Sequence, residues 1–262
     1  MTLAARVNPT RFIVVGDMHS LISKWYLEIL PIVRKHGIKV VVSTGDLKTT
    51  DGGDLDYIEL LSQMLRLEGI LLVFVDGNHD RHNFLRYLMK GRYDRFCHVR
   101  ENIWYAPRGL RWNWQGVTLM AAGGAYSIDR RGQEIRGIYE PKEIIETADV
   151  KRAAKSGPAQ IVVSHDCPLE VNLATLHEWR RPWTRGNSPE TDLNRARLSL
   201  IVSAAEATAV LHGHYHLDYT TSYTNSATGA LIQVHGLGAN GERGTMRLVM
   251  LDRGQYHIER VD

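Results

Sequence analysis

The sequence predicts an α/β fold, in part α+β, in which two β-sheets of mixed strands form a sandwich flanked by helices. In the first ninety residues, short apolar runs alternate with amphipathic segments, a pattern typical of parallel strands joined by crossover helices. Further apolar runs bounded by turn residues follow from residue 102 onward. Several runs end in residues that can bind metal, and open α/β sheets place their chemistry at the carboxyl ends of strands.

Three strand–turn–helix units open the chain. Their strands are expected at residues 11–15, 39–43 and 70–75. The turns after these strands are Gly16-Asp17-Met18-His19, Gly45-Asp46 and Gly77-Asn78-His79-Asp80. Ser20 is expected to cap the first helix, Asp54 or a neighbour begins the second, and residues 81–90 form the third.

The pattern changes after residue 102. Strands are expected at 103–105, 110–114, 117–121, 160–164 and 209–211, and antiparallel strands near 219–224, 230–235, 246–251 and 256–261. Gln115-Gly116 predicts a hairpin turn, and the glycine-rich, charged residues 122–137 predict an active-site loop or lid. Helices are expected at 141–155 and, after a Ser188 cap and Pro189, as far as residue 206.

Composition indicates an ordinary globular protein. The 262 residues are 44% hydrophobic and 23% charged, with a net charge of only +3, so nothing predicts a dedicated nucleic-acid-binding domain. Two cysteines, Cys97 and Cys167, argue against a disulfide framework and favour a reducing cytoplasm. We see no signal peptide and no membrane span, and expect one catalytic domain over residues 1–262.

Polar residues collect where the predicted strands end, and they form a set of oxygen and nitrogen donors without a thiolate: Asp17, His19, Asp46, Asn78, His79, His165, His214 and His216. Such a set suits Mn²⁺, Fe or Zn²⁺. It is too large for one catalytic metal with an open position, but suits two metals that share a bridging carboxylate. Two metals about 3.5–4 Å apart can clamp a phosphoryl group and lower the pKa of a water towards about 7.

The blocks at residues 16–19, 45–46, 77–80, 164–165 and 213–216 stand in the order typical of calcineurin-like metallophosphoesterases, and the chain resembles that family. The resemblance implies that the first metal binds Asp17, His19 and His216, and that the second binds Asn78, His165 and His214, with Asp46 as the bridge. It places His79 near the leaving-group oxygen, with its ring oriented by Asp80 or Asp17. Mn²⁺ is the first expectation for both metals, with Fe or Zn²⁺ as alternatives.

Departures from subfamilies narrow the expected substrate. Leu47-Lys48-Thr49 after Asp46, together with Asp80, disfavours the Ser/Thr phosphoprotein phosphatases, and the extra histidine of the repair nucleases is missing. The chain looks more like small bacterial and phage phosphodiesterases. We expect hydrolysis of small phosphodiesters, including 2′,3′-cyclic nucleotides, by a metal-activated hydroxide. The alternatives are a phosphomonoesterase or protein phosphatase, or a non-catalytic scaffold of the same fold.

Other segments leave two interpretations open. Residues 168–190, with Trp179 and Trp183, predict either a functional loop or a homo-oligomer interface. His212 is expected in the core or behind the metal ligands. Arginines 130, 131 and 136 either bind phosphate or lie in solvent.

Overall fold

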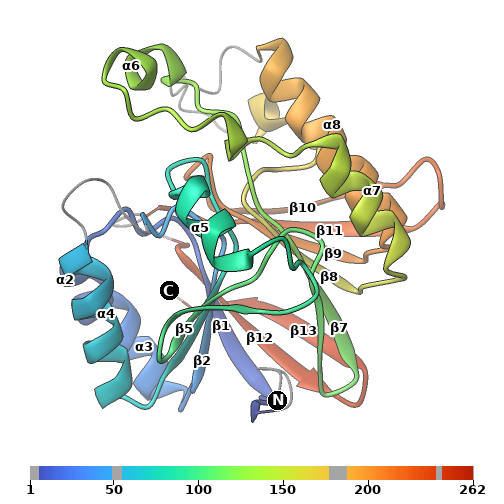
Figure 1. Cartoon of the computed structure of the whole chain (residues 1–262). Coiled ribbons are helices and arrows are strands. Elements are labelled where there is room, and N and C mark those ends of the chain that lie inside the picture. Colours follow the sequence, from blue (N-terminus) through green and yellow to red (C-terminus); the bar gives the residue numbers. More distant parts are fainter. Residues whose placement is uncertain (1–5, 49–54, 177–187, 240–243, 262) are drawn as a thin grey trace.

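The computed structural model describes residues 6–48, 55–176, 188–239 and 244–261. Two β-sheets pack face to face, with helices on their outer sides (Figure 1). The first sheet has the order β13-β12-β1-β2-β3-β5-β4, from β1 (Arg11–Val15), β2 (Val40–Ser43), β3 (Leu71–Phe74), β4 (Cys97–Arg100), β5 (Ile103–Tyr105), β12 (Met246–Asp252) and β13 (Gln255–Arg260). The second has the order β10-β11-β9-β8-β7-β6, from β6 (Arg111–Trp114), β7 (Val117–Ala122), β8 (Ile161–Ser164), β9 (Ala209–His212), β10 (Tyr219–Thr224) and β11 (Leu231–Gly236). The predicted two-sheet α/β class is confirmed.

Helices cover both outer faces. Those beside the first sheet are α2 (Ile22–Lys24), a π-helical turn (Trp25–Ile29), α3 (Leu30–Lys35), α4 (Leu55–Leu67) and α5 (His82–Met89). Those that follow are α6 (Arg130–Ile135), a 3₁₀ turn (Pro141–Glu143), α7 (Thr147–Lys155), a second 3₁₀ turn (Leu173–Thr175) and α8 (Pro189–Ala204). In Figure 1, α7 and α8 lie along the second sheet, and α6 projects beyond the strand ends. No described helix is both long enough and apolar enough to cross a membrane.

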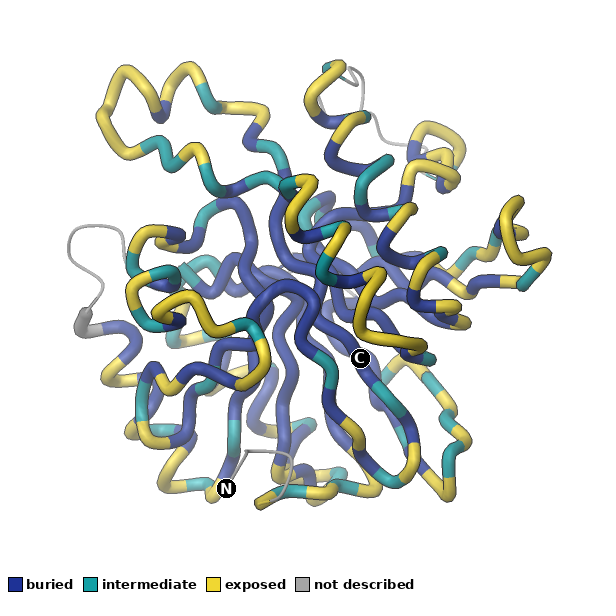
Figure 2. Tube along the Cα trace, turned by 45° about the vertical axis from the view of Figure 1, so that its right-hand side comes forward, coloured by how far each residue is buried: buried dark blue, intermediate teal, exposed yellow. Residues whose placement is uncertain are grey.

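The strands carry apolar residues on both faces because each sheet is covered by the other sheet on one face and by helices on the other. In β1, Ile13 packs among the helices and Phe12 packs towards the second sheet. In β8, Val163 lies in the core between the sheets and Val162 packs in the core that includes α8. Figure 2 shows the central strands as buried and the peripheral loops as exposed. Each buried side chain of this size contributes about 1.5–3 kcal/mol to folding, so these cores hold the strand ends firmly in place.

The parallel pairing puts the functional turns at one edge. Strands β1, β2 and β3 are parallel neighbours, and so are β7, β8 and β9. The carboxyl ends of parallel strands meet on the same side of a sheet, so the polar turns after these strands converge. The predicted Gln115-Gly116 turn joins β6 to β7, and both residues have a positive φ, as a type I′ turn requires.

The expected Ser20 cap is wrong. Helix α2 begins at Ile22, and its N-cap position is Leu21, without a side-chain cap. Ser20 has a φ of 60° and follows His19 with a φ of 44°. An N-cap residue needs extended backbone angles, and the sharp turn that carries His19 prevents them at Ser20. The predicted cap at Ser188 is confirmed, because its hydroxyl accepts a hydrogen bond from the Thr191 backbone N–H.

The predictions for residues 122–155 are correct only in part. The glycine-rich segment expected to be a loop contains the short helix α6. The helix expected over 141–155 is interrupted: a 3₁₀ turn ends at Glu143, and α7 starts at Thr147 with Glu146 as its cap. The break turns the Glu143 side chain into the interior, where it is fully buried.

Two strand features were not foreseen. Strand β4 was missed; its polar, charged sequence gives little apolar signal, and its pairing with β5 contains an irregularity at His98. The late strands are not all antiparallel, because β11 runs parallel to β9. Both features depend on how the strands pair with one another, and a local apolar pattern does not predict such pairing.

Candidate metal centre

The candidate ligands reach one place from both sheets. Asp17, Asp46 and Asn78 follow β1, β2 and β3 of the first sheet, whereas the histidines at 165, 214 and 216 follow β8 and β9 of the second. The five turns that carry them meet at the common strand edge. The site therefore depends on how the two sheets pack against each other.

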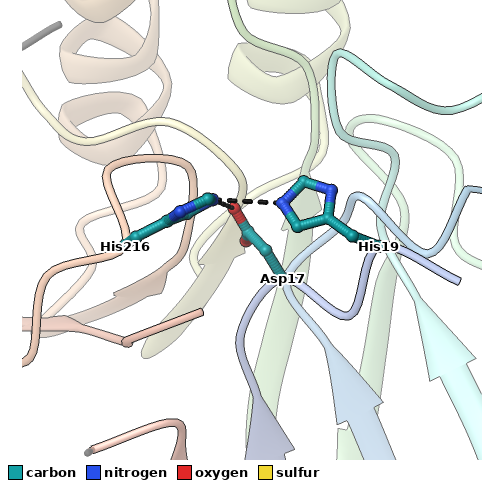
Figure 3. Close-up of side chains that lie close together, drawn as sticks. All are labelled: Asp17, His19 and His216. Carbon is teal, nitrogen blue, oxygen red and sulfur yellow. Dashed lines mark hydrogen bonds and ion pairs between the residues drawn. The ribbon is translucent and has the colours of Figure 1, made fainter. Parts of the chain in front are cut away.

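The first group contains Asp17, His19 and His216 (Figure 3). His216 Nε2 lies 3.0 Å from Asp17 Oδ2 and 3.1 Å from His19 Nε2. Each residue offers a ligand atom within 4.8 Å of the others, a spacing that could hold a cation. Asp17 is buried, whereas both histidines are part-exposed, so this group opens towards solvent.

The second group contains Asp17, Asp46 and His165, all buried. His165 Nε2 lies 3.4 Å from Asp46 Oδ1 and 3.0 Å from Asn78 Oδ1. His165 Nδ1 lies 2.9 Å from the Thr44 carbonyl oxygen. A carbonyl oxygen only accepts, so Nδ1 carries a proton, and Nε2 is the ring nitrogen that faces the oxygens and that a metal ion would occupy in place of a proton.

Asp46 belongs to the second group and also faces the first. Its Oδ1 faces His165, and its Oδ2 is 4.0 Å from His19 Nδ1. His214 contacts the centre in two ways: its backbone N–H donates to both Asp17 oxygens, at 3.1 and 3.0 Å, and its ring centroid is 5.0 Å from that of His165. The structure thus brings the seven predicted residues to one place, and Asp17 is the residue common to both groups. The role of Asp46 as the bridge stays a prediction.

The backbone at these ligands adopts an unfavourable conformation. Four of the seven have a positive φ: His19 (44°), Asp46 (49°), His214 (67°) and His216 (55°). Left-handed angles are uncommon outside glycine, and strained residues gather at functional sites because the surrounding structure holds them there. The well-packed strand ends on either side supply that constraint.

Two glycines allow the carboxylates to approach the turns. A Cβ on Gly77 would lie 2.2 Å from Asp46 Oδ1, and a Cβ on Gly213 would lie 2.0 Å from Asp17 Oδ1. Any side chain at these positions would push the carboxylates out of place. This explains the glycine in both the Gly-Asn-His-Asp and Gly-His-Tyr-His blocks.

The charges of the centre attract a cation. Burial alone would lower the pKa of His165, but the carboxylates of Asp46 and Asp17 raise it to about 10. Burial opposes ionisation of Asp46, yet His165 and His79 hold its pKa well below the ordinary value. Burial lowers the pKa of His214 to about 4, so this ring is neutral and able to ligate. The carboxylates that hold a second proton on His165 would hold a metal ion there in its place. With imidazole nitrogens, ionised carboxylates and no thiolate, the donors fit two divalent metal ions.

His79 borders a cavity beside the centre. Its backbone N–H donates to Asp46 Oδ1 at 2.8 Å, and its ring centroid is 5.7 Å from that of His19. The cavity has a volume of about 450 Å³, and its lining includes Lys48, Arg136 and Tyr139. Asp80 is buried, and its Oδ2 accepts the Gly77 N–H at 2.8 Å, so it braces the turn. Orientation of the His79 ring by Asp80 or Asp17 stays a prediction.

Several supporting residues were not predicted. Asp166 accepts hydrogen bonds from the Tyr215 hydroxyl at 2.9 Å and from Asn194 Nδ2 at 2.6 Å, which ties the two histidine turns to α8. Ser127 and Glu143 lie behind Asn78. Position next to a motif was a usable signal for Asp166, whereas nothing local marks Ser127 or Glu143.

His212 is buried behind the site, as expected, and its Nδ1 donates to the Gly213 carbonyl. Trp179 and Trp183 lie outside the described residues.

Comparisons with known proteins identify the family and the fold. The family model for calcineurin-like phosphoesterase matches residues 10–218. A lariat debranching enzyme from Schizosaccharomyces pombe is 25% identical over 166 residues, which are 58% of this chain and 34% of that protein. The chain thus matches about a third of the length of this curated relative. The crystal structure of TT1561 of Thermus thermophilus has a TM-score of 0.53 at 13% identity, over 96% of this chain and 99% of that one.

Proposed function

The chain belongs to the calcineurin-like phosphoesterase family, and from this premise we propose that it hydrolyses small phosphodiesters, with 2′,3′-cyclic nucleotides as candidate substrates. Membership makes metal-dependent hydrolysis of a phosphate ester its general activity. We further propose Mn²⁺ as the native metal, with Fe or Zn²⁺ as alternatives, because the donors are oxygen and imidazole nitrogen.

The observation that carries the diester proposal is the cavity beside His79. Its volume of about 450 Å³ suits a small ligand. A diester has an esterified group on each side of the phosphorus, so one group needs room beyond the metal centre. The charged residues of its lining are Lys48, Arg81 and Arg136 together with Asp80, Asp129 and Glu140, and Ile138 and Tyr139 give it apolar surface for a sugar or base.

Two divalent ions bound by the seven side chains would neutralise the phosphate oxygens and lower the pKa of a water molecule. A side chain of the protein supplies the proton for the departing oxygen, on the side of the phosphorus opposite the activated water. The His79 ring borders the cavity, where it can donate a proton to the departing oxygen. Lys48 can attract the anionic substrate towards the centre. The name of the curated relative, a lariat debranching enzyme, supports a diester bond as the target.

The test compares two esters on metal-stripped protein reloaded with Mn²⁺: bis-p-nitrophenyl phosphate and p-nitrophenyl phosphate. We expect kcat/KM to favour the diester at least about tenfold, a difference of about 1.4 kcal/mol in transition-state binding. The same comparison then uses 2′,3′-cyclic AMP against 3′-AMP. Preference for the monoesters would move the assignment to a phosphatase. No turnover with Mn²⁺, Fe²⁺ or Zn²⁺ would favour a scaffold.

A cavity variant tests where the substrate binds. Arg136 lines the cavity and is paired with Asp129 at 3.6 Å. Arg136→Gln removes a cation that contacts the bound diester before and during reaction, so KM should rise several-fold with little change in kcat. Arg131→Gln, at an exposed position of α6 away from the cavity lining, is the control. Equal KM values for both variants would place the substrate elsewhere.

A further inference from the structure

A buried pair of residues closes the outer wall of the cavity. We call this pair, Ser127 and Glu143, the clasp; the residues between them include α6 and several that line the cavity. Glu143 Oε1 accepts a hydrogen bond from the Ser127 backbone N–H at 2.9 Å, and Oε2 accepts one from the Ser127 hydroxyl at 2.7 Å. Both residues are fully buried. The two hydrogen bonds therefore hold the start and the end of the wall together in the interior.

The clasp also sets a hydrogen-bond direction at Asn78. The Ser127 hydroxyl has one hydrogen, which it donates to Glu143, so its oxygen accepts from Asn78 Nδ2 at 3.0 Å. With its NH₂ group turned to Ser127, Asn78 presents Oδ1 to the centre, 3.0 Å from His165 Nε2. Only the oxygen of a carboxamide has a lone pair for a cation, whereas the NH₂ group repels one. The orientation of this amide thus decides whether Asn78 can ligate.

We propose that Glu143 is a positioning residue for the second metal: through Ser127 it orients the Asn78 amide so that the oxygen faces the ion. The same carboxylate fastens the cavity wall, so the wall and the second metal site form together. This inference rests on the proposed function in one respect, the assignment of Asn78 as a ligand. It concerns metal binding, and it can be tested without substrate.

The first test is Glu143→Gln, which preserves the size of the side chain. The Ser127 backbone N–H can only donate, so it donates to the side-chain oxygen of the introduced glutamine. The NH₂ group of that side chain then faces the Ser127 hydroxyl. That hydroxyl then has its own hydrogen free for Asn78, which favours the flipped amide. We expect the second Mn²⁺ to bind about 10- to 100-fold more weakly, the usual effect of losing a group that orients a ligand, with the first unchanged. Isothermal titration of metal-stripped protein with Mn²⁺ at pH 8, where the Glu143 carboxyl is mostly ionised, measures both affinities.

A double variant that exchanges the carboxamide and the carboxylate tests the direction of the hydrogen bonds separately from the packing of the side chains. In Asn78→Asp/Glu143→Gln the two functional groups exchange and the total charge is kept. The serine hydrogen can then be donated to the carboxylate introduced by Asn78→Asp, while the other oxygen of that carboxylate faces the metal. In Asn78→Asp alone, two carboxylates compete for one hydroxyl hydrogen. We therefore expect Asn78→Asp to tighten binding of the second Mn²⁺ at least about tenfold more in the Glu143→Gln background than in the wild type, a non-additive result in the double-mutant cycle. Additive effects would overturn the proposed direction.

Glu134→Gln is the matched control, because Glu134 lies on the same wall in an exposed ion pair with Arg130. It should bind two Mn²⁺ as the wild type does. Equal second-site affinity in Glu143→Gln and the wild type would overturn the inference while leaving the diesterase proposal intact. A wild type that binds two Mn²⁺ but prefers monoesters would overturn the diesterase proposal and leave this inference intact. A wild type with a single site would overturn both. If Glu143→Gln does not fold, Ser127→Ala should show the same selective loss.

Discussion

At the residue scale, His79 serves the site with two separate groups. Its backbone N–H holds Asp46 Oδ1, and its ring contacts the cavity. A substitution of the side chain keeps the backbone hydrogen bond. The position of the candidate bridging carboxylate and the proton chemistry of the ring can therefore be studied independently.

His79→Ala should retain two bound metals and lose turnover. General acid catalysis is worth about 10²–10⁴ in rate, and most when the leaving group is a poor one. We expect kcat on a 2′,3′-cyclic nucleotide, which expels an alkoxide, to fall by that range, and kcat on bis-p-nitrophenyl phosphate to fall less. Metal analysis and steady-state kinetics measure the two effects. His257→Ala, an exposed position on β13, is the control. An unchanged kcat on the cyclic nucleotide would remove His79 from the mechanism.

Glu143 gives a second prediction at this scale, because burial raises the pKa of its carboxyl to about 7 despite two hydrogen bonds from Ser127. The unfolded chain has the ordinary value near 4.5. Between these values the folded state binds more protons than the unfolded state, so this group stabilises the fold below pH 4.5 and that contribution is lost as the pH rises through 7.

Urea unfolding of metal-stripped protein between pH 4.5 and 8 measures this contribution. The free energy of unfolding of the wild type relative to Glu143→Gln should fall with pH, by on the order of 3 kcal/mol over the window. Glu134→Gln, with its exposed carboxyl, should track the wild type. A constant difference between wild type and Glu143→Gln at all pH values would show that the carboxyl is not perturbed in the folded chain.

At the element scale, Arg108 joins β3, β5 and the region before α7. It is 6% exposed and donates to Asp76 Oδ2 from Nε at 2.9 Å and from Nη2 at 2.5 Å. It also contacts Asp149 of α7 at 3.3 Å and the Glu143 carbonyl at 2.8 Å. Asp76 directly precedes the Gly-Asn-His-Asp turn, and Tyr105 donates to its other oxygen at 2.9 Å. One guanidinium thus links the turn that carries Asn78 to the segment that carries Glu143.

Arg108→Met should destabilise the protein by about 3–5 kcal/mol, because it leaves the Asp76 carboxylate buried without its cation. Burial opposes ionisation of Asp76, yet Arg108 holds its pKa below the ordinary value, and this stabilisation is present above the unfolded pKa and lost as the pH falls. The deficit of the variant should therefore shrink in acid. Arg66→Met, which breaks an exposed pair with Glu101, should cost at most about 1 kcal/mol. Equal urea midpoints for the two variants would contradict the role of Arg108.

The elements that sequence analysis predicted well are those with strong local patterns. Buried strands such as β1 and β3 are continuous apolar runs, and the metal-binding turns directly follow them. Hence the spacing of Asp17 and Asn78 from their strands could be predicted, and their convergence followed from parallel pairing. Local and long-range requirements agree at these positions, as expected of sequences that specify one fold.

The features that escaped prediction depend on contacts between distant segments. Glu143 looks like an exposed helical residue, and its burial arises only when the chain from 127 to 143 folds back so that Ser127 meets it. Ser20 looks like a cap, but the turn at His19 imposes a positive φ on it. In both places the assembly of the site overrides the local preference, which is typical of functional regions.

At the scale of the whole molecule, the candidate centre spans the seam between the two sheets. Asp17 and Asp46 come from the first sheet, and His165 and His216 come from the second. The buried carboxylates and His165 are close enough to perturb one another strongly, so each depends on the sheets staying packed. Ions bound by these residues would connect the sheets directly, and the unfolded chain has no such preformed site.

Mn²⁺ should therefore stabilise the whole fold. A ligand that binds only the native state adds about 2.7 kcal/mol at 100 times its Kd, and 1 kcal/mol corresponds to about 2–4 °C in Tm at this chain length. We expect Tm of metal-stripped protein to rise by several degrees with excess Mn²⁺, as measured by circular dichroism. Asp46→Asn, which weakens both sites at the expected bridge, should lose most of this gain, whereas Asp94→Asn at an exposed position should keep it. If Mn²⁺ left the Tm of the wild type unchanged, the two sheets would not be sharing a metal centre.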